Sequence, residues 1–175
     1  GMHNWPGLPA GDVAVNTGAC MASADQFAIT LTGRGSHAAM PHQAIDPILA
    51  AASLIQALQM VVSRTTDPLD PAVLSVTMLN GGSAFNVIPD TVTLGGTARA
   101  MVASTRAAME QKIRDISALT AKAHGCLVEV DWQPGYPPTV NTETEALRAA
   151  DVARAVVGSN KGQVNMPRSM VAEDV

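Results

Sequence analysis

The sequence predicts an α+β fold: a two-layer sandwich in which a four-stranded antiparallel sheet carries two helices on one face. Residues 26–32 alternate between apolar and polar side chains, which is typical of a half-buried antiparallel strand. Two segments, 46–64 and 104–124, repeat apolar side chains at helical spacing. The predicted order of elements is β-α-β-β-α-β, and its simplest arrangement is a single sheet of ferredoxin-like topology.

Local signals place the first strand and the helix that follows it. Gly33 and Gly35 end the strand, and Pro47 suits the first turn of the helix, where a missing amide proton costs no hydrogen bond. The apolar residues that we expect to face the sheet are Ile48, Ala52, Ile55, Leu58 and Val62.

Two neighbouring antiparallel strands are predicted at residues 73–79 and 91–99. Glycine pairs at 81–82 and 95–96 indicate bulges or a close approach of two backbones. The second helix is expected to begin near Ser104 as its N-cap and to end at Gly125, before a last strand at 126–132. Its expected inner face carries Met109, Ile113, Ile116, and Thr120 or Leu119.

Both flanks lie outside this unit, so three parts are predicted: residues 1–22, 23–136 and 137–175. The segment Pro-Gly-Tyr-Pro-Pro at 134–138 has the composition of a linker or hinge. One more helix is expected over 142–157, with a modest apolar stripe made by Leu147, Ala150, Ala153 and Val157. The chain ends without a turn signal, which suggests a truncated segment.

Composition narrows the classes of function. A net charge of -4 without a basic block, and only 3% aromatic residues, argue against a nucleic-acid partner. Because no signal-peptide pattern and no apolar run of membrane-spanning length is found, we expect a cytoplasmic protein without a membrane partner. Cys20 and Cys126 are far apart and are expected to be free thiols rather than zinc ligands.

Three polar residues are candidates for a site. His37 follows glycines at a strand end, although a loop histidine taken alone is more often a capping or surface residue. Asn86 is either a turn residue or a hydrogen-bonding group for a substrate carboxylate or amide. Arg99 is either a solvated charge at a strand end or a clamp for a carboxylate.

Both ends of the chain carry further candidates whose simpler interpretation is solvent exposure. His3 alone cannot hold a metal, so an exposed terminal residue is the more frequent case. Glu173 and Asp174 are adjacent carboxylates, but spacing by itself favours a solvated chain end.

Five motifs, in this order, resemble the metal-dependent aminoacylase and carboxypeptidase family, and most closely its hippurate hydrolase or N-acyl-amino-acid amidohydrolase branch. The resemblance covers essentially the whole chain. Its carriers are Gly-Met-His-Asn-Trp-Pro at 1–6, Gly-Arg-Gly-Ser-His-Ala-Ala-Met-Pro-His at 33–42, Phe-Asn-Val-Ile-Pro-Asp at 85–90, Gly-Tyr-Pro-Pro-Thr-Val at 135–140 and Ser-Met-Val-Ala-Glu-Asp at 169–174.

The resemblance implies a role for each part. In this family a two-metal catalytic domain is split by an inserted dimerisation or lid domain, which residues 23–136 match, so 1–22 and 137–175 would be pieces of the two catalytic halves. By resemblance, His37 would reach the partner subunit's active site and polarise the scissile carbonyl. Asn86 and Arg99 would orient the substrate carboxylate, and His3 matches a metal-ligating position.

Several family features are absent from this sequence. The first metal motif, of the type His-x-Cys-Gly-His-Asp or His-x-Asp, and the Glu-Glu pair that supplies the base do not occur, and the final histidine ligand would lie beyond Val175. We therefore expect a homodimeric fragment of a hydrolase of N-acyl amino acids (hippurate-like) or small peptides, which binds no metal pair and is inactive alone. Zinc, manganese or a similar divalent metal would serve the intact enzyme.

An alternative is a free-standing α/β dimeric module that binds a small molecule or regulates another protein. The two flanking motifs argue against it, because in the family they belong to the catalytic domain.

Overall fold

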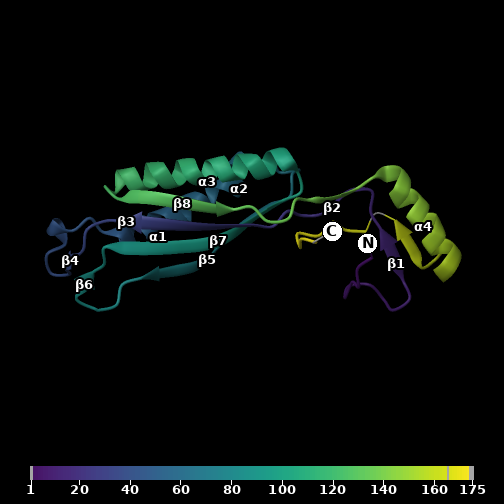
Figure 1. Ribbon diagram of the computed structural model, residues 1–175, viewed down its shortest axis with the longest axis horizontal. Helices are drawn as coiled ribbons and strands as arrows, with labels where there is room; N and C mark the ends of the chain where they lie inside the picture. The colour runs from purple at the N-terminus through teal and green to yellow at the C-terminus, as the bar shows by residue number, and fades with distance from the viewer. Residues whose placement is uncertain (1, 165, 174–175) are drawn as a thin grey trace.

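The computed structural model, which describes residues 2–164 and 166–173, has two parts joined end to end (Figure 1). The larger part, here called the sandwich, contains the elements from β3 (Asp25–Thr32) to β8 (Leu127–Gln133). The smaller part, here called the flanking unit, combines short strands from both ends of the chain with helix α4 (Glu143–Val157). Both chain ends lie close to the junction of the two parts.

The sandwich contains the predicted four-stranded antiparallel sheet. Strands β5 (Ala72–Gly81) and β7 (Thr91–Ala100) complete it, and the strand order is β5-β7-β3-β8. This is the ferredoxin-like order, in which the first and third strands of the unit are central. Strand β3 alternates between buried and exposed side chains along its length, as its sequence predicted.

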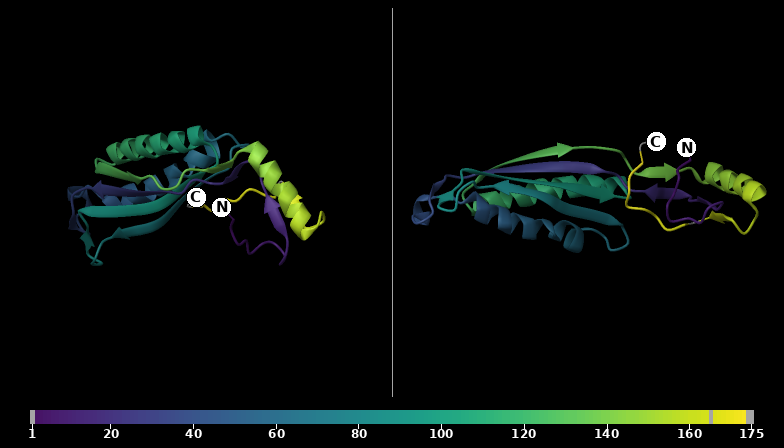
Figure 2. Two further views of the ribbon diagram at one scale, coloured as in Figure 1. Left: turned by 45° about the vertical axis from the view of Figure 1, so that its right-hand side comes forward. Right: turned by 90° about the horizontal axis from the view of Figure 1, so that it is seen from below.

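Helices α1 (Pro47–Leu58), α2 (Met60–Thr65) and α3 (Ala103–Ala123) cover one face of this sheet (Figure 2). Helix α1 contacts β3, β5 and β7, and α2 contacts β5, whereas α3 packs against β7 and β8. The largest fully buried side chains of the core between the two layers are Ile29, Leu31, Leu54, Leu58, Leu94 and Ile113. The predicted fold class is confirmed.

The face that α1 and α2 pack on the sheet matches the expected one only in part: Leu58 is fully buried, and Ile55 and Val62 pack against the core. Ala50, Ala51 and Leu54 are buried, whereas Ile48 is 47% exposed and Ala52 is exposed. The prediction was wrong for Ile48 and Ala52 because this helix is apolar on nearly every side, so spacing alone does not define an inner face. Asp46 caps the helix by accepting a hydrogen bond from the Ile48 amide at 2.8 Å, and Pro47 occupies the first turn as expected.

Helix α3 also departs from the sequence prediction in detail. It begins at Ala103 after Val102, and Ser104 lies inside the first turn without capping it. Its buried residues are Met109, Ile113, Ser117 and Ala121. Met109 and Ile113 are buried and Ile116 packs against the core, as predicted, whereas Leu119 is 68% exposed and its alternative Thr120 is half-buried. Gly125, at φ +72°, ends the helix as predicted, because that conformation favours glycine.

The glycine pair in β7 marks a close backbone approach, as predicted. Strand β5 has a register shift between Val76 and Met78, opposite this pair. A Cβ atom on Gly96 would collide with the Ser75 carbonyl oxygen and with the Phe27 ring. The bulge therefore depends on the missing side chain.

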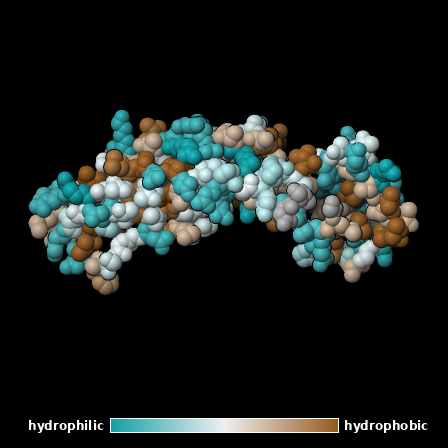
Figure 3. Space-filling model, viewed as in Figure 1, coloured by the Kyte–Doolittle hydropathy of each residue, from teal (hydrophilic) through white to brown (hydrophobic). Residues whose placement is uncertain are grey.

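The flanking unit pairs segments that are far apart in the sequence. Strand β1 (Val13–Val15) runs parallel to β10 (Gly162–Val164), and β2 (Gly18–Met21) is antiparallel to β9 (Thr139–Asn141). Helix α4 forms where a helix was predicted, but it buries Ala146 and Ala150 and leaves Leu147 45% exposed. Apolar side chains consequently appear on the surface of this part (Figure 3).

One segment, 47–65, is long and apolar enough to span a membrane by length and composition alone. The expectation that no uninterrupted apolar run has this length is not contradicted, because Ser53, Gln56 and Gln59 interrupt the segment. The segment covers α1 and α2, and its inner residues belong to the core of the sandwich.

Candidate functional site

The end of the sandwich farthest from the flanking unit carries two of the predicted site residues, and we call it the tip. There β4 (Ser36–His37) pairs with β6 (Val87–Ile88), which places His37 opposite Val87 (Figure 1). The Ala38 amide donates to the Asn86 carbonyl oxygen at 2.9 Å, so Asn86 is held beside His37. The structure thus brings together two residues that lie 49 positions apart in the sequence.

Asp90 anchors this pairing to the sheet. Its Oδ1 accepts a hydrogen bond from the Gly35 amide at 2.7 Å, and its carbonyl oxygen accepts one from the Gly33 amide at 2.8 Å. A Cβ atom on Gly35 would meet the Ile88 carbonyl oxygen at 2.5 Å. The glycines of this motif therefore allow the two loops to lie in direct contact.

A backbone hydrogen bond selects the tautomer of the neutral His37 ring. Nδ1 accepts a hydrogen bond from the Ala39 amide at 3.1 Å. In the neutral ring the proton must then lie on Nε2, which is left as a donor. His37 and Asn86 are both exposed, and Phe85 beside them is fully exposed, so the tip presents hydrogen-bond donors next to an apolar side chain.

Arg99 lies at the opposite end of the sandwich. Strand β7 runs for ten residues between the tip and the junction, a span of about 30 Å at 3.3 Å per residue. The Arg99 guanidinium is half-buried and donates through Nη1 to the Met170 carbonyl oxygen at 3.2 Å. One copy of the chain therefore cannot place Asn86 and Arg99 on the same carboxylate.

His3 and Glu173 meet at the junction, although 170 positions separate them. His3 Nδ1 lies 2.9 Å from Glu173 Oε2, and the Glu173 side chain is only 16% exposed. This overturns the expectation that Glu173 lies at a solvated chain end. The only sequence signal for a role of Glu173 in a site was its place in the fifth motif, at 169–174. Asp174 lies outside the described residues.

These two residues fit part of a metal site. Glu173 Oε2 is buried, and among the described residues no aligned hydrogen bond reaches it, despite the short distance to His3. Imidazole nitrogen and carboxylate oxygen are both donors that zinc and related metals accept. Within residues 2–164 and 166–173, however, no group of three histidine, cysteine or acidic side chains is placed to hold a metal ion. Further ligands would have to come from outside this part of the chain.

Both cysteines are free, as predicted. Burial raises the pKa of the Cys20 thiol and of the Cys126 thiol, so neither is activated as a nucleophile. Neither residue contributes to the tip or to the His3–Glu173 contact.

The family model of the peptidase dimerisation domain matches residues 23–124, which is more than half of the chain. The chain belongs to this family. The predicted resemblance to the amidohydrolases and peptidases that contain this domain is therefore confirmed.

The relatives of this chain carry the names of hydrolases. N-acetyl-L-cysteine deacetylase of Bacillus subtilis is 42% identical over 153 residues, which are 87% of this chain and 37% of the relative. Hippurate hydrolase of Campylobacter jejuni is 37% identical over 174 residues, which are 99% of this chain and 45% of the relative. The chain thus spans less than half the length of these relatives.

A solved structure from Bacillus subtilis, described as a dinuclear metal binding peptidase of the M20 family, resembles the whole chain. It superposes with a TM-score of 0.75 at 30% identity, over 97% of this chain and 41% of that protein. The likeness extends over both the sandwich and the flanking unit.

Proposed function

We propose that this chain is the dimerisation and lid portion of a metal-dependent amidohydrolase that cleaves the amide bond of N-acyl amino acids, hippurate-like, or of small peptides. The named relatives support the reaction class. The observation that carries the proposal is the position of His37 at the tip, because β7 alone spans about 30 Å between the tip and the junction. A site built at the junction needs this histidine from a second copy.

Each active site would then combine residues of two subunits. His37 donates from Nε2 to the oxygen of the scissile carbonyl as negative charge develops there, and the Asn86 amide helps to hold the substrate beside it. Arg99 comes from the subunit that carries the junction, and its guanidinium binds the substrate carboxylate through paired hydrogen bonds. A divalent metal such as zinc or manganese, with His3 among its ligands, supplies an activated water when it is bound.

The homodimer would form through one side of the sandwich. Strand β5 is an edge strand of the sheet, and its outer half exposes Met78 and Leu79 at 59% and 57%. The helices on that side expose Leu49 at 58% and Met60 at 50%. A second copy that pairs along this edge would cover both apolar surfaces and leave no open sheet edge there.

The 175-residue chain alone would be a dimer without hydrolase activity, because the described part of the chain supplies only two candidate metal ligands and no base. Sedimentation velocity at micromolar concentration should show the dimer. Leu49→Glu, at a position of α1 that is 58% exposed, should convert it to monomer, whereas Leu127→Glu, at a position of the opposite edge strand β8 that is 75% exposed, should not. A wild-type monomer would contradict the proposal, as would hippurate hydrolysis by this chain with added zinc or manganese.

Exchange of residues between subunits can be tested in a chimera. The chain would replace the matching region of the Bacillus subtilis N-acetyl-L-cysteine deacetylase, to which it is 42% identical. His37→Ala and His3→Ala should each abolish hydrolysis of an N-acetyl amino acid. After the two inactive variants are mixed and allowed to exchange subunits, about a quarter of the activity should return, since half of the dimers then contain one complete site. No recovery from a mixture shown to contain mixed dimers would refute the two-subunit site.

A further inference from the structure

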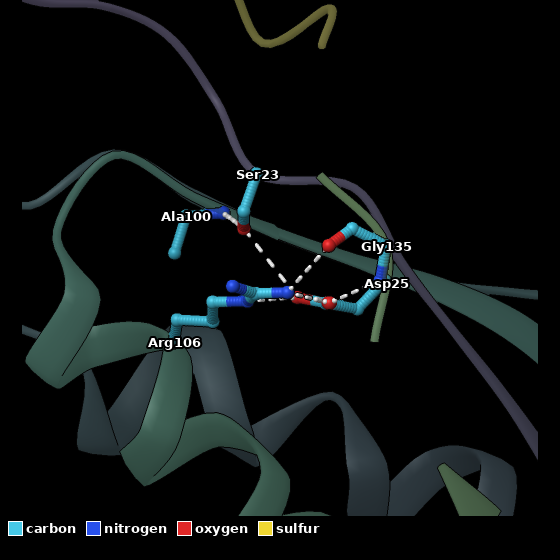
Figure 4. A network of polar contacts seen from close by, with 5 residues as sticks. All are labelled: Ser23, Asp25, Ala100, Arg106 and Gly135. Carbon is cyan, nitrogen blue, oxygen red and sulfur yellow. Dashed lines mark hydrogen bonds and ion pairs between the residues drawn. The ribbon is translucent and has the colours of Figure 1, made fainter. Parts of the chain in front are cut away.

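A buried charge pair lies where the sandwich joins the flanking unit. Asp25, the first residue of β3, is 1% exposed, and Arg106 reaches it from the first turn of α3 (Figure 4). Arg106 Nε donates to Asp25 Oδ2 at 2.8 Å, and its Nη2 donates to the other carboxylate oxygen. This paired geometry is the strong form of the arginine–carboxylate contact, and Asp25 raises the pKa of Arg106.

The same two side chains also hold both connections between the parts. The Gly135 amide, two residues beyond the end of β8, donates to Asp25 Oδ1 at 3.1 Å, and the Gly135 carbonyl oxygen accepts from Arg106 Nη2 at 3.1 Å. On the incoming connection, Ser23 Oγ donates to Asp25 Oδ2 at 3.4 Å and accepts from the Ala100 amide at 3.1 Å. All donors around the carboxylate come from α3 and the two connections.

The two connections are bonded to each other as well. The Ala24 amide donates to the Tyr136 carbonyl oxygen at 3.0 Å, and a Cβ atom on Gly135 would collide with the Ala24 carbonyl oxygen. Prolines at 134, 137 and 138 restrict the outgoing connection further. The two connecting segments between the sandwich and the flanking unit are therefore bonded to each other.

Another arginine on the same helix shows that this arrangement is specific to the junction. Arg114, two turns further along α3, bonds to Glu110 and to the Val130 carbonyl oxygen at 2.9 Å. It ties the helix to β8 inside the sandwich and contacts neither connection. The two arginines thus offer a matched comparison between the junction and the sandwich.

We propose that Asp25 and Arg106 form a clamp that sets the orientation of the sandwich relative to the flanking unit. Asp25 accepts a hydrogen bond from Ser23, and Ser23 accepts one from the Ala100 amide. The residue before Ala100 is Arg99, which donates to the Met170 carbonyl oxygen in the flanking unit. Asp25 and Arg106 are therefore positioning residues for Arg99. Their importance for catalysis rests on the proposed function, but the clamp itself does not.

The physical basis is the cost of a buried charge without a partner. Replacing Arg106 by a neutral residue leaves the Asp25 carboxylate buried and uncompensated. Asp25 lies at the end of its strand, so water can reach it if the connections separate from α3. Loss of the cation should therefore open the junction rather than the core of the sandwich.

The test uses the whole 175-residue chain with Cys20 and Cys126 replaced by alanine. Spin labels at residue 118, on the exposed side of α3, and at residue 148, on the exposed side of α4, report the distance between the two parts by double electron–electron resonance. An excess of unlabelled chain removes distances between copies. The parent should give one narrow distance distribution.

Arg106→Gln should at least double the width of that distribution and speed hydrogen exchange of the Gly135 amide at least ten-fold, with exchange in the middle of β3 unchanged. Arg106→Lys should lie between parent and Arg106→Gln, and Arg114→Gln should match the parent. An unchanged width in Arg106→Gln, or equal broadening in Arg114→Gln, would overturn the clamp. If Arg106→Gln does not fold, the Asp25→Asn/Arg106→Gln pair, which leaves no buried charge, is measured instead and must also broaden the distribution. Neither dimerisation nor activity enters these measurements.

Discussion

The sandwich and the flanking unit differ in how completely they bury their apolar side chains. The sandwich packs a continuous apolar core between its sheet and its helices, whereas α4 of the flanking unit buries only two alanines and leaves Val152 59% and Val156 78% exposed. Its sheets are two-stranded pairs of three or four residues, which are marginal without further support. The comparison indicates that the sandwich can fold by itself, while the flanking unit depends on contacts with the junction and, under the proposed function, with the remainder of a catalytic domain.

The largest expected effect concerns the two cores. Leu54→Ala, at a fully buried position, should lower the free energy of unfolding by about 2–5 kcal/mol, because it removes buried methyl groups and leaves a cavity. Leu147→Ala in α4, where the side chain is 45% exposed, should change it by less than about 0.5 kcal/mol. Urea denaturation followed by circular dichroism measures both. Similar losses would show that the two parts form one cooperative core.

Hydrogen exchange compares the same parts without mutation. Amides of β3 and β7, in the centre of the main sheet, should exchange at least about a hundred-fold more slowly than those of β1 and β10. Mass spectrometry of exchanged peptides resolves these segments. Equal exchange rates in both parts would show that the flanking unit is as stable as the sandwich.

Two adjacent glycines of β7 test whether the bulge in β5 depends on a close backbone approach. Gly96→Ala should destabilise the sandwich by about 1–3 kcal/mol, because its Cβ would collide with a backbone carbonyl. Gly95→Ala should cost less, since the nearest atoms lie 3.3 Å away in the flexible Met78 side chain. Thermal denaturation of the two variants gives the comparison, and equal costs would show that the bulge does not depend on the close approach.

The smallest expected effect on stability compares the observed N-cap of α1, Asp46, with the predicted N-cap of α3, Ser104. Asp46→Ala should cost about 1 kcal/mol, since its carboxylate accepts two amide hydrogen bonds at the start of α1. Ser104→Ala should be nearly neutral, because Ser104 makes no capping bond in α3. A larger loss for Ser104→Ala in urea denaturation would restore it as the N-cap.

Much of the sandwich was predictable because its signals are local. Alternation in β3, the proline and glycine that bound the helices, and the glycine pair in β7 all act within a few residues. The inner face of α1 was only partly predictable, since a helix that is apolar on nearly every side can turn any of its sides toward a sheet. Asp25 did offer a signal that was missed: it shares the inward phase of Phe27, Ile29 and Leu31 in β3, and a charge in that phase requires a buried partner.

By itself, the sequence determined the order of elements, the fold class and, through its five motifs, the hydrolase family. Only the tertiary structure decided that His37 and Asn86 lie at one end of the sandwich while Arg99 lies at the other, with His3 and Glu173 beyond it. Local periodicity carries no information about such distances, because they depend on which strands pair and on the length of β7 between the two ends. The same long-range pairing places Asp25, Arg106 and Gly135 together at the junction, where no short stretch of sequence contains them all.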